Sequence, residues 1–450
     1  MRRLFRYLKG YEKETVIAPL FKMLEACFEL LVPLVVARIV DEGIQNADLP
    51  FIWRQCGLLV LLAVVGMASS LTAQYFAAKS ALGFGTALRR DLFAHINTLS
   101  HTELDRMGTP TLVTRMTSDV NQVQNGLNMT LRLLLRSPFI VIGAILMALT
   151  ISPVLTLWFL GITAVISLVI WAIMRATVPI YHDAQTTLDR VTQLTRENYV
   201  GARVVRAFSR QKDEMAGFAA ANDRLRDVQL AAGRISALMN PITYLIVNLG
   251  AIAILWHGGR QVDAGALTQG EVMALLNYLS QILLNLLRIA DLVIIMTRAV
   301  ASAVRVSEVL ATPTTMPDPA APELDAVPGA PAVAFEDVGF AYAGAGAPSL
   351  TGVTLAAAPG ETIGVIGGTG SGKTTFVSLI PRFYDATGGQ VLLFGHDVRR
   401  YGFAQLRRMI GVVPQKAVLF TGTIRDNMRW AKPDATDEEI WAALEIAQAA

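Results

Sequence analysis

One stretch decides the fold of the C-terminal part of this chain: Glu361-Thr362-Ile363-Gly364-Val365-Ile366, followed at once by Gly367-Gly368-Thr369-Gly370-Ser371-Gly372-Lys373-Thr374. The first six residues are typical of a short buried strand, and a mostly apolar helix is expected from Phe376. Strand, glycine-rich loop and helix, in this order, match the pattern G-x-x-x-x-G-K-S/T in the setting that it requires. The sequence therefore predicts a soluble α/β domain with a phosphate-binding loop.

The chemistry of this loop follows from its residue types. Glycines let backbone N–H groups converge on phosphate oxygens, and the positive end of the following helix adds to the attraction. We expect Lys373 to reach the β- and γ-phosphates and the Thr374 hydroxyl to ligate Mg²⁺. The expected cofactors are thus ATP and Mg²⁺. The nucleotide would be held by Gly367, Gly368, Thr369, Gly370, Ser371, Gly372, Lys373, Thr374 and Thr375.

Two weaker features lie on either side of the loop. Tyr342 ends a strand-like segment, 332–342, which is followed by a second one at 350–356, and its ring could stack on adenine. Gln415 ends a segment, 411–415, that has the pattern of a buried strand, and it could reach the Mg²⁺ or the attacking water. By residue type alone a core aromatic and a surface glutamine are the ordinary interpretations, so these alternatives stay open.

The N-terminal part has the composition of a membrane protein. Hydrophobic residues make up 53% of the chain and charged residues 17%, with a mean hydropathy of +0.45. Six apolar runs are predicted to be transmembrane helices, at about 15–39, 56–78, 137–151, 152–174, 236–258 and 272–296. The third is short, and we expect Leu131 to Leu135 to extend it while Arg132 and Arg136 reach toward the interface.

The net charge and the two cysteines do not indicate a nucleic-acid-binding, disulfide-rich or metal-binding protein. The net charge of +3 does not indicate a nucleic-acid partner. Cys27 and Cys56 lie in apolar runs and have neither the spacing of a disulfide framework nor that of a metal site.

The positions of the basic residues predict the orientation. With a cytosolic N-terminus, residues 1–14, 79–136 and 175–239 face the cytosol and hold 22 Lys and Arg, against 3 on the opposite side. The positive-inside bias thus predicts a multi-pass protein of the cytoplasmic membrane, with the N-terminus and the C-terminal domain in the cytosol. Residues 1–14 interleave basic and apolar side chains, which favours a helix on the membrane lipid surface.

The cytosolic connections and the linker complete the domain organisation. Both long connections are predicted to be helical stalks, about 30 Å long for about 20 residues an arm. Breaks are expected at Met107-Gly108-Thr109-Pro110 and Val200-Gly201, with short helices at the tips, near 102–107 and 198–206. Six prolines predict an extended linker over 311–331. The expected domains are a transmembrane domain over 1–310, this linker, and the beginning of an ATPase domain over 332–450.

Polar residues inside the predicted membrane helices are candidates for a substrate cavity, because facing lipid would be costly. They are Glu25 and Glu29 on the first helix, and Asn277, Gln281, Asn285 and Arg288 in one stripe on the sixth. One interpretation is interhelical hydrogen bonding with local pairs, such as Lys22–Glu25 and Arg288–Asp291. The other is a cavity wall that contacts a cationic amphiphile.

These motifs resemble those of ABC-type exporters of the multidrug class, half-transporters with an N-terminal membrane domain fused to an ATPase domain. The resemblance covers the whole chain. It is carried by "VARIVDEGI", "RRDLF", "LVTRMTSDV", "ENYVGARVVRAFSR", the phosphate loop, "VPQKAVLFTGTIRDNM" and "ATDEEIWAALEIAQAA". Several of these segments are similar to one subunit of bacterial heterodimeric exporters.

The resemblance implies a fold class: a type IV exporter domain with six transmembrane helices, followed by a partial α/β P-loop ATPase domain. It also implies that Tyr342 stacks on adenine and that Gln415 links the nucleotide state to the stalk tips. The tip helices would be coupling helices, the second docking on the ATPase domain of a second half-transporter in a heterodimer or homodimer. ATP hydrolysis would then drive export of lipophilic, drug-like small molecules.

Alternatives within and outside this activity remain open. One is a lipid or peptide exporter, and another is a catalytically silent, regulatory half-transporter. The family's Ser-Gly-Gly-Gln signature, Walker B aspartate, catalytic glutamate and switch histidine do not occur in these 450 residues. No catalytic residue is therefore assigned, and we expect no ATPase activity from these residues alone.

Overall fold

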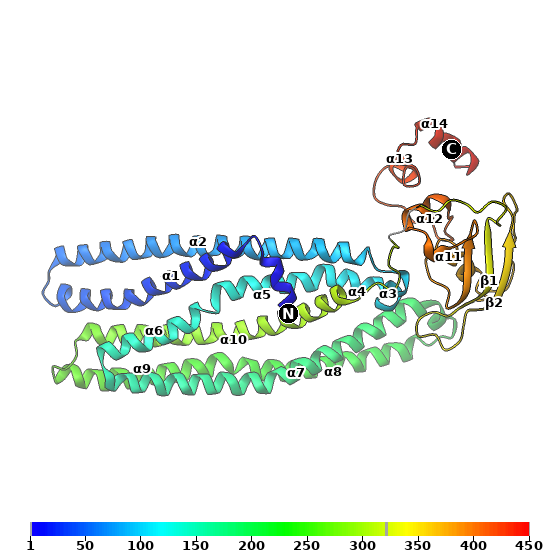
Figure 1. Cartoon of the computed structure of the whole chain (residues 1–450). Helices are drawn as coiled ribbons and strands as arrows, with labels where there is room; N and C mark the ends of the chain where they lie inside the picture. Colours follow the sequence, from blue (N-terminus) through cyan, green and yellow to red (C-terminus); the bar gives the residue numbers. More distant parts are fainter. Residues whose placement is uncertain (1, 320–322, 450) are drawn as a thin grey trace. The chain divides into compact units, whose positions relative to one another are not determined.

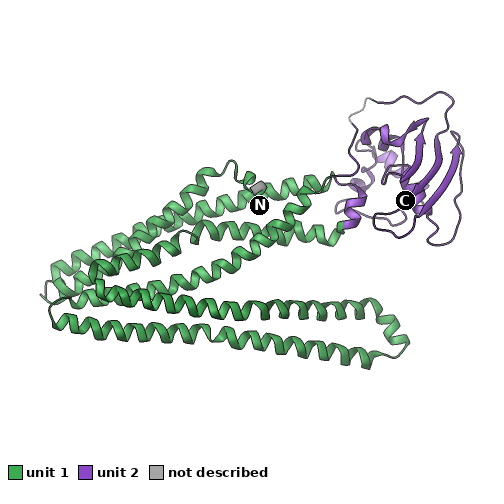
Figure 2. Cartoon of the chain, turned by 60° about the horizontal axis from the view of Figure 1, so that its bottom comes forward, with its two compact units in different colours: residues 1–98, 107–313 green, residues 99–106, 314–450 purple. Residues whose placement is uncertain are grey.

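The computed structural model describes residues 2–319 and 323–449, which form two compact units. One unit comprises Met1–Thr98 and Met107–Pro313, and the other Leu99–Arg106 and Thr314–Ala450. Figure 2 shows that the first unit is built of helices and that the second contains the sheet. The short segment Leu99–Arg106 thus packs with the C-terminal residues, although in sequence it lies between stalk helices.

The helical unit consists of long helices that run side by side (Figure 1). All six predicted membrane segments lie in helices, namely α1, α2, α6, α7, α9 and α10. The elements in chain order are η1 Arg2–Leu8, α1 Glu12–Arg38, η2 Ile39–Ile44, α2 Leu49–Ile96, α4 Thr109–Thr114, η3 Arg115–Asp119, α5 Val120–Leu133, α6 Arg136–Ile151, α7 Pro153–Ala207, α8 Gln211–Ala237, α9 Met239–Asp263 and α10 Gln269–Ala311.

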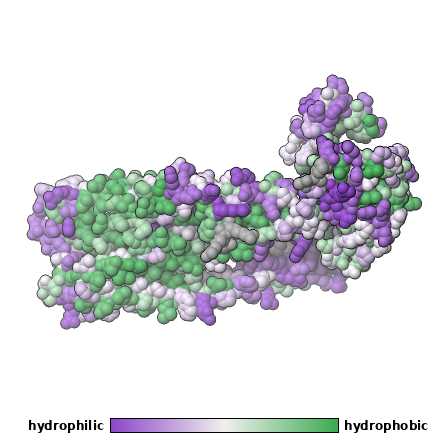
Figure 3. All heavy atoms as spheres, viewed as in Figure 1, coloured by the Kyte–Doolittle hydropathy of each residue, from purple (hydrophilic) through white to green (hydrophobic). Residues whose placement is uncertain are grey.

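Five helical stretches of the described residues are long and apolar enough to cross a membrane: Leu49–Ile96, Thr109–Ile151, Pro153–Ala207, Gln211–Asp263 and Gln269–Ala311. Helix α1 is not among them, and it carries Lys22, Glu25 and Glu29 within its apolar run. Figure 3 shows where the apolar surface gathers: it covers the part of the unit next to the α1–α2 connection, whose own tip is hydrophilic. An apolar band between polar regions is the surface of a membrane-spanning bundle.

The stalk predictions are confirmed at one tip and wrong at the other. Helix α3, His101–Met107, ends before Gly108, whose φ is 76°, as the first predicted break requires. The second predicted break is wrong, because α7 continues through Gly201 and ends at Ala207, and the turn comes at Ser209 with φ 54°. One glycine weakens a helix by only about 1 kcal/mol, which long neighbouring turns of good helix formers outweigh. The tip near 198–206 is therefore the end of α7 and not a separate helix.

The connection after α1 holds the first turn of α10. Asp41 accepts hydrogen bonds from the Thr268 hydroxyl (2.6 Å) and from the Gly270 backbone N–H (2.7 Å). A Cβ added at Gly270 would lie 2.2 Å from the backbone oxygen of Ala37, so only glycine fits this close approach.

The C-terminal unit is built on a four-stranded antiparallel sheet of order β2-β1-β3-β4. Its strands are β1 Val333–Phe340, β2 Leu350–Ala357, β3 Gly388–Leu393 and β4 His396–Asp397. The two strands predicted at 332–342 and 350–356 are thus confirmed. The core between sheet and helices is filled by Phe335, Val338, Leu379, Val391 and Tyr401. The remaining elements are α11 Lys373–Leu379, η4 Val398–Arg400, α12 Phe403–Met409, α13 Ile424–Met428 and α14 Asp437–Ile446.

Two further strand predictions are wrong. Residues 361–366 and 411–415 form no strand, and Ile366 and Val413 are 96% and 97% exposed. A buried parallel strand needs hydrogen-bonded neighbours on both sides, and no described strand lies beside either segment.

The described part of 312–331 has neither helix nor strand, yet it contacts the C-terminal unit. Asp318 accepts a hydrogen bond from the Phe403 N–H (2.8 Å), and the Val327 N–H donates to the Phe394 carbonyl (3.1 Å). The linker therefore lies along this unit and is fixed to it by hydrogen bonds from both a side chain and the backbone.

Candidate functional site

The phosphate loop is exposed and is shaped by two glycines. Gly370 and Gly372 have φ of 83° and 85°, in the left-handed region that favours glycine, and α11 begins at the next residue. The Lys373 ammonium donates to the carbonyls of Gly367 (2.9 Å) and Gly368 (2.7 Å) and thus lies across the loop. This arrangement holds one cation at the loop and next to the N-terminus of α11, where a polyphosphate is attracted.

Tyr342 lies close to this loop. Its hydroxyl is 2.9 Å from the Thr375 hydroxyl, within hydrogen-bond distance, and its side chain keeps part of its surface exposed. Beside it is a cavity of about 770 Å³, which is lined by Thr102, Asp105, Arg106, Thr315, Met316, Phe340, Ala341, Tyr342, Ala343, Gly344, Tyr384, Asp385 and Thr387. The structure therefore brings Tyr342, Thr375 and the loop together, with room for a base.

Gln415 is not brought into this arrangement. It lies in an exposed bend, and no hydrogen bond joins it to the loop within the described residues. Thr374 is exposed at the start of α11, and its hydroxyl is free of hydrogen bonds within the described residues. In the described chain no cluster of three His, Cys, Asp or Glu side chains could hold a metal ion.

The firm packing of α3 on the C-terminal unit was not predicted from the sequence. Glu103 is buried and accepts hydrogen bonds from the Ser100 N–H (2.9 Å), the Ser100 hydroxyl (2.5 Å) and the Thr315 hydroxyl (2.8 Å). Burial alone would raise the pKa of Glu103, but these hydrogen bonds outweigh it and hold the pKa below its usual value. The pattern Ser-x-x-Glu is a helix-start signal that could have located the beginning of α3, although not its contact with Thr315.

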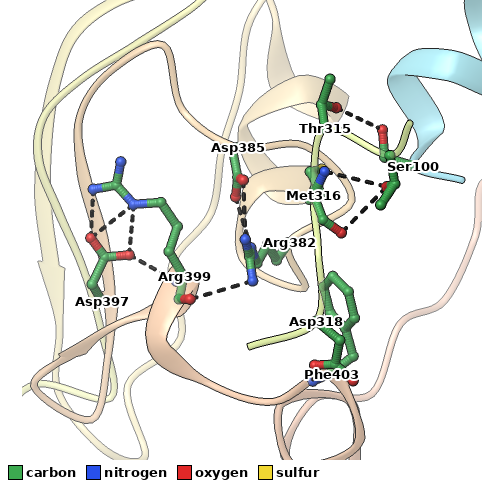
Figure 4. A network of polar contacts seen from close by, with 10 residues as sticks. Ser100, Thr315, Met316, Asp318, Arg382, Asp385, Asp397, Arg399 and Phe403 are labelled. Carbon is green, nitrogen blue, oxygen red and sulfur yellow. Dashed lines mark hydrogen bonds and ion pairs between the residues drawn. The ribbon is translucent and has the colours of Figure 1, made fainter. Parts of the chain in front are cut away.

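A second set of contacts anchors α3 to the segment after α11. The His101 ring lies 5.0 Å from the Phe383 ring, and the Tyr384 hydroxyl donates to Asp105 (2.6 Å). Figure 4 shows the surrounding polar network, in which Ser100 meets Thr315. In the same view Arg382 pairs with Asp385, and Arg399 pairs with Asp397.

Charged residues inside the helical unit form one network. Arg136 pairs with Glu29 at 2.5 Å and lies 3.7 Å from Glu25, which in turn pairs with Lys22 at 2.5 Å. Arg136 is buried, so the expectation that it reaches toward the interface is wrong. Its partners lie on another helix, and two oppositely charged neighbours in a low-dielectric interior hold it there. With two cations and two carboxylates the network has no net charge.

Of the four polar residues predicted to form a stripe on α10, two contact this network and two lie at the surface. Asn285 is buried and accepts from Arg136 at 3.5 Å, while Gln281 donates to the Glu29 carbonyl at 3.4 Å. Asn277 and Arg288 are exposed. Within the described residues the expected pair between Arg288 and Asp291 is not formed, whereas the pair between Lys22 and Glu25 is. Three buried atoms of this region, Arg136 Nε, Ser137 Oγ and Gln281 Oε1, have no hydrogen-bond partner in the described chain.

An apolar helical bundle followed by a phosphate loop defines a membrane transporter driven by a nucleotide, and comparisons with known proteins agree. Residues 15–287 match the family "ABC transporter transmembrane region", and residues 350–450 match the family "ABC transporter". The chain belongs to the ABC transporter family, with the type IV exporter membrane fold and an ATPase domain, and is an ATP-hydrolysing half-transporter.

Three relatives illustrate the range of the similarity. An uncharacterized ABC transporter ATP-binding protein of Mycobacterium tuberculosis is 36% identical over 99% of this chain and 77% of its own length. A fatty acid ABC transporter ATP-binding/permease protein of the same species is 35% identical over 81% of this chain and 56% of its own. A multidrug efflux ATP-binding/permease protein of Mycobacterium tuberculosis is 29% identical over 98% of this chain and 36% of its own.

Proposed function

We propose that this protein exports lipophilic, drug-like compounds across the cytoplasmic membrane, with ATP and Mg²⁺ as cofactors and a second half-transporter as partner. The proposal that the substrates are amphiphiles rests on the polar network around Arg136. It lies inside a bundle whose outer surface is apolar, and Glu29 keeps about a third of its side chain exposed. A partly exposed charge inside an apolar bundle suits a polar headgroup whose apolar part occupies the bundle or lipid.

The substrate cavity in this proposal is formed by Glu25, Glu29, Asn277, Gln281, Asn285 and Arg288. The exposed members, Asn277 and Arg288, would line a space that the partner completes. Because the network is neutral, a cationic amphiphile needs one carboxylate to leave its own partner. Lipid export is the second candidate, and the relative named for fatty acid supports it.

The nucleotide site in this proposal consists of Tyr342 for the base, Gly367 to Thr375 for the phosphates, and Thr374 with Gln415 for Mg²⁺. Its support is the contact between Tyr342 and Thr375 and the position of Lys373 across the loop. We further propose the division into domains at 1–310, 311–331 and 332–450, with the N-terminus and ATPase domain in the cytosol.

The partner would contact the tip formed by the end of α7 and the start of α8. This tip exposes Tyr199, Val200, Phe208 and Met215, each more than 70% accessible. Apolar side chains gathered at the end of a polar stalk are typical of a protein interface. The proposal assigns them to the ATPase domain of a second half-transporter.

Transport by the full-length pump with its partner, reconstituted in inside-out proteoliposomes, tests the proposal. Lys373→Ala should abolish ATP-dependent uptake of a lipophilic cationic dye, while Lys416→Ala, which removes an exposed lysine outside the loop, should not. Glu25→Gln leaves the membrane network with a net positive charge, so it should reduce cation uptake several-fold and spare a neutral lipophilic compound. Equal losses for both compounds, or no uptake of either by the unaltered protein, would contradict the proposed substrate class.

A further inference from the structure

The cavity beside Tyr342 has two walls that come from distant parts of the sequence. One wall consists of the end of β1 and the segment around Tyr384, and the other consists of Thr102, Asp105 and Arg106 of α3. All of these residues belong to the same compact unit. The space into which a base stacked on Tyr342 would extend is therefore bounded by α3.

Tyr384 belongs to the first wall and also contacts the second. Its ring lies 5.3 Å from the Tyr342 ring at an interplanar angle of 84°, an edge-to-face contact, and Phe340 packs against both rings. Its hydroxyl donates a 2.6 Å hydrogen bond to the Asp105 carboxylate. Edge-to-face pairs have a preferred geometry, so the orientation of one ring restrains the other.

We propose that Tyr384 is a positioning residue that links occupancy of the base site at Tyr342 to the docking of α3, through its hydrogen bond to Asp105. This inference rests on the proposed function, in which Tyr342 stacks on the base of ATP. A stacked base fixes the Tyr342 ring, the ring contact fixes Tyr384, and the Tyr384 hydroxyl then holds Asp105. Because such coupling is reciprocal, docked α3 strengthens binding of a ligand that carries a base.

The protonation state of the hydroxyl supports this link. Burial, and then the neighbouring Asp105 carboxylate, raise the pKa of Tyr384 above its usual value. The hydroxyl therefore remains a donor over the whole physiological range. Asp105 is exposed, so replacing it removes the hydrogen bond without opening a core.

The test compares two ligands that share phosphates and differ in the base, namely MgATP and magnesium tripolyphosphate. Their affinities for the full chain in lipid nanodiscs are measured by calorimetry. Tyr384→Phe and Asp105→Ala should each weaken MgATP about five-fold, the low end of typical coupling, and leave tripolyphosphate unchanged. The double variant should lose no more than either single one, because both remove the same hydrogen bond.

Tyr401→Phe is the matched control, because it removes a tyrosine hydroxyl that donates to the Leu393 carbonyl (2.8 Å) elsewhere in the same unit. It should lower the unfolding temperature and leave the ratio of the two affinities unchanged. Equal weakening of both ligands by Tyr384→Phe and Asp105→Ala, or unchanged MgATP affinity, would overturn the link.

Tyr342→Leu separates this inference from the proposed function. One outcome is that Tyr342→Leu lowers the affinity for MgATP and not that for tripolyphosphate, while Tyr384→Phe and Asp105→Ala change neither affinity. The base site at Tyr342 is then supported, and the link through Tyr384 is wrong. If it leaves MgATP binding unchanged, the base site itself is wrong and the link falls with it.

Discussion

Arg136 on α6 and Glu29 on α1 form a 2.5 Å ion pair inside the helical unit, although 107 residues separate them in sequence. Together with Glu25 and Lys22 they give the helical unit a charge-balanced centre. Arg136 is the buried member of this pair, and leaving one charge without its partner is more costly than removing both.

Replacing Arg136 alone should therefore destabilise the protein more than replacing the pair. Arg136→Leu should lower the free energy of unfolding by about 3 kcal/mol, and Arg136→Leu/Glu29→Leu by clearly less. Thermal unfolding in detergent, followed by tryptophan fluorescence, measures both. Additive losses in the double variant would show that the two side chains do not interact.

The docking of α3 should depend on pH through Glu103. Its pKa is lowered in the folded protein, so its stabilising contribution is present above the ordinary value of 4.5 and is lost as the pH falls through the folded value. The unfolding temperature of the wild type should exceed that of Glu103→Gln at pH 7, and the difference should shrink below pH 4.5. A difference that stays constant down to pH 3.5 would contradict this assignment.

The start of α10 should tolerate no side chain at Gly270. Gly270→Ala brings a Cβ to 2.2 Å from the Ala37 carbonyl, a backbone atom that cannot rotate away, so a loss of about 2 kcal/mol is expected. Gly259→Ala is the matched control, because nothing lies within 4 Å of its added Cβ and alanine favours the helix by about 0.5–1 kcal/mol. The two unfolding temperatures should move in opposite directions.

Features of the fold that depend on neighbouring residues in the sequence could be predicted from sequence patterns. The glycines and Lys373 located the phosphate loop, apolar runs located the membrane helices, and the pair between Lys22 and Glu25 followed from helical spacing. The contact of Arg136 with Glu29 could not be predicted, because it depends on which helices are neighbours. Residues 361–366 have the pattern of a buried strand, but strand formation requires a partner that the sequence pattern does not specify.

In the candidate site, too, some residues could be predicted from the sequence and others depend on tertiary packing. Tyr342 was a candidate by its place at a strand end, and the structure brings it to Thr375. Tyr384 and Asp105 were not candidates, since each is an ordinary surface-type residue until α3 packs against the segment after α11. The break expected at Val200-Gly201 was wrong because one glycine is a weak signal inside a long run of helix formers.

The exposed segments around Ile366 and Val413 have a consequence during synthesis. Ile366 and Val413 are apolar and 96% and 97% exposed, and exposed apolar segments of this kind are templates for pairing between neighbouring chains. Ribosomes that translate one message side by side bring several copies of these segments together. Chaperones that bind short apolar peptides should therefore engage the nascent chain here, and a charged substitution at Val413 should reduce co-translational aggregation.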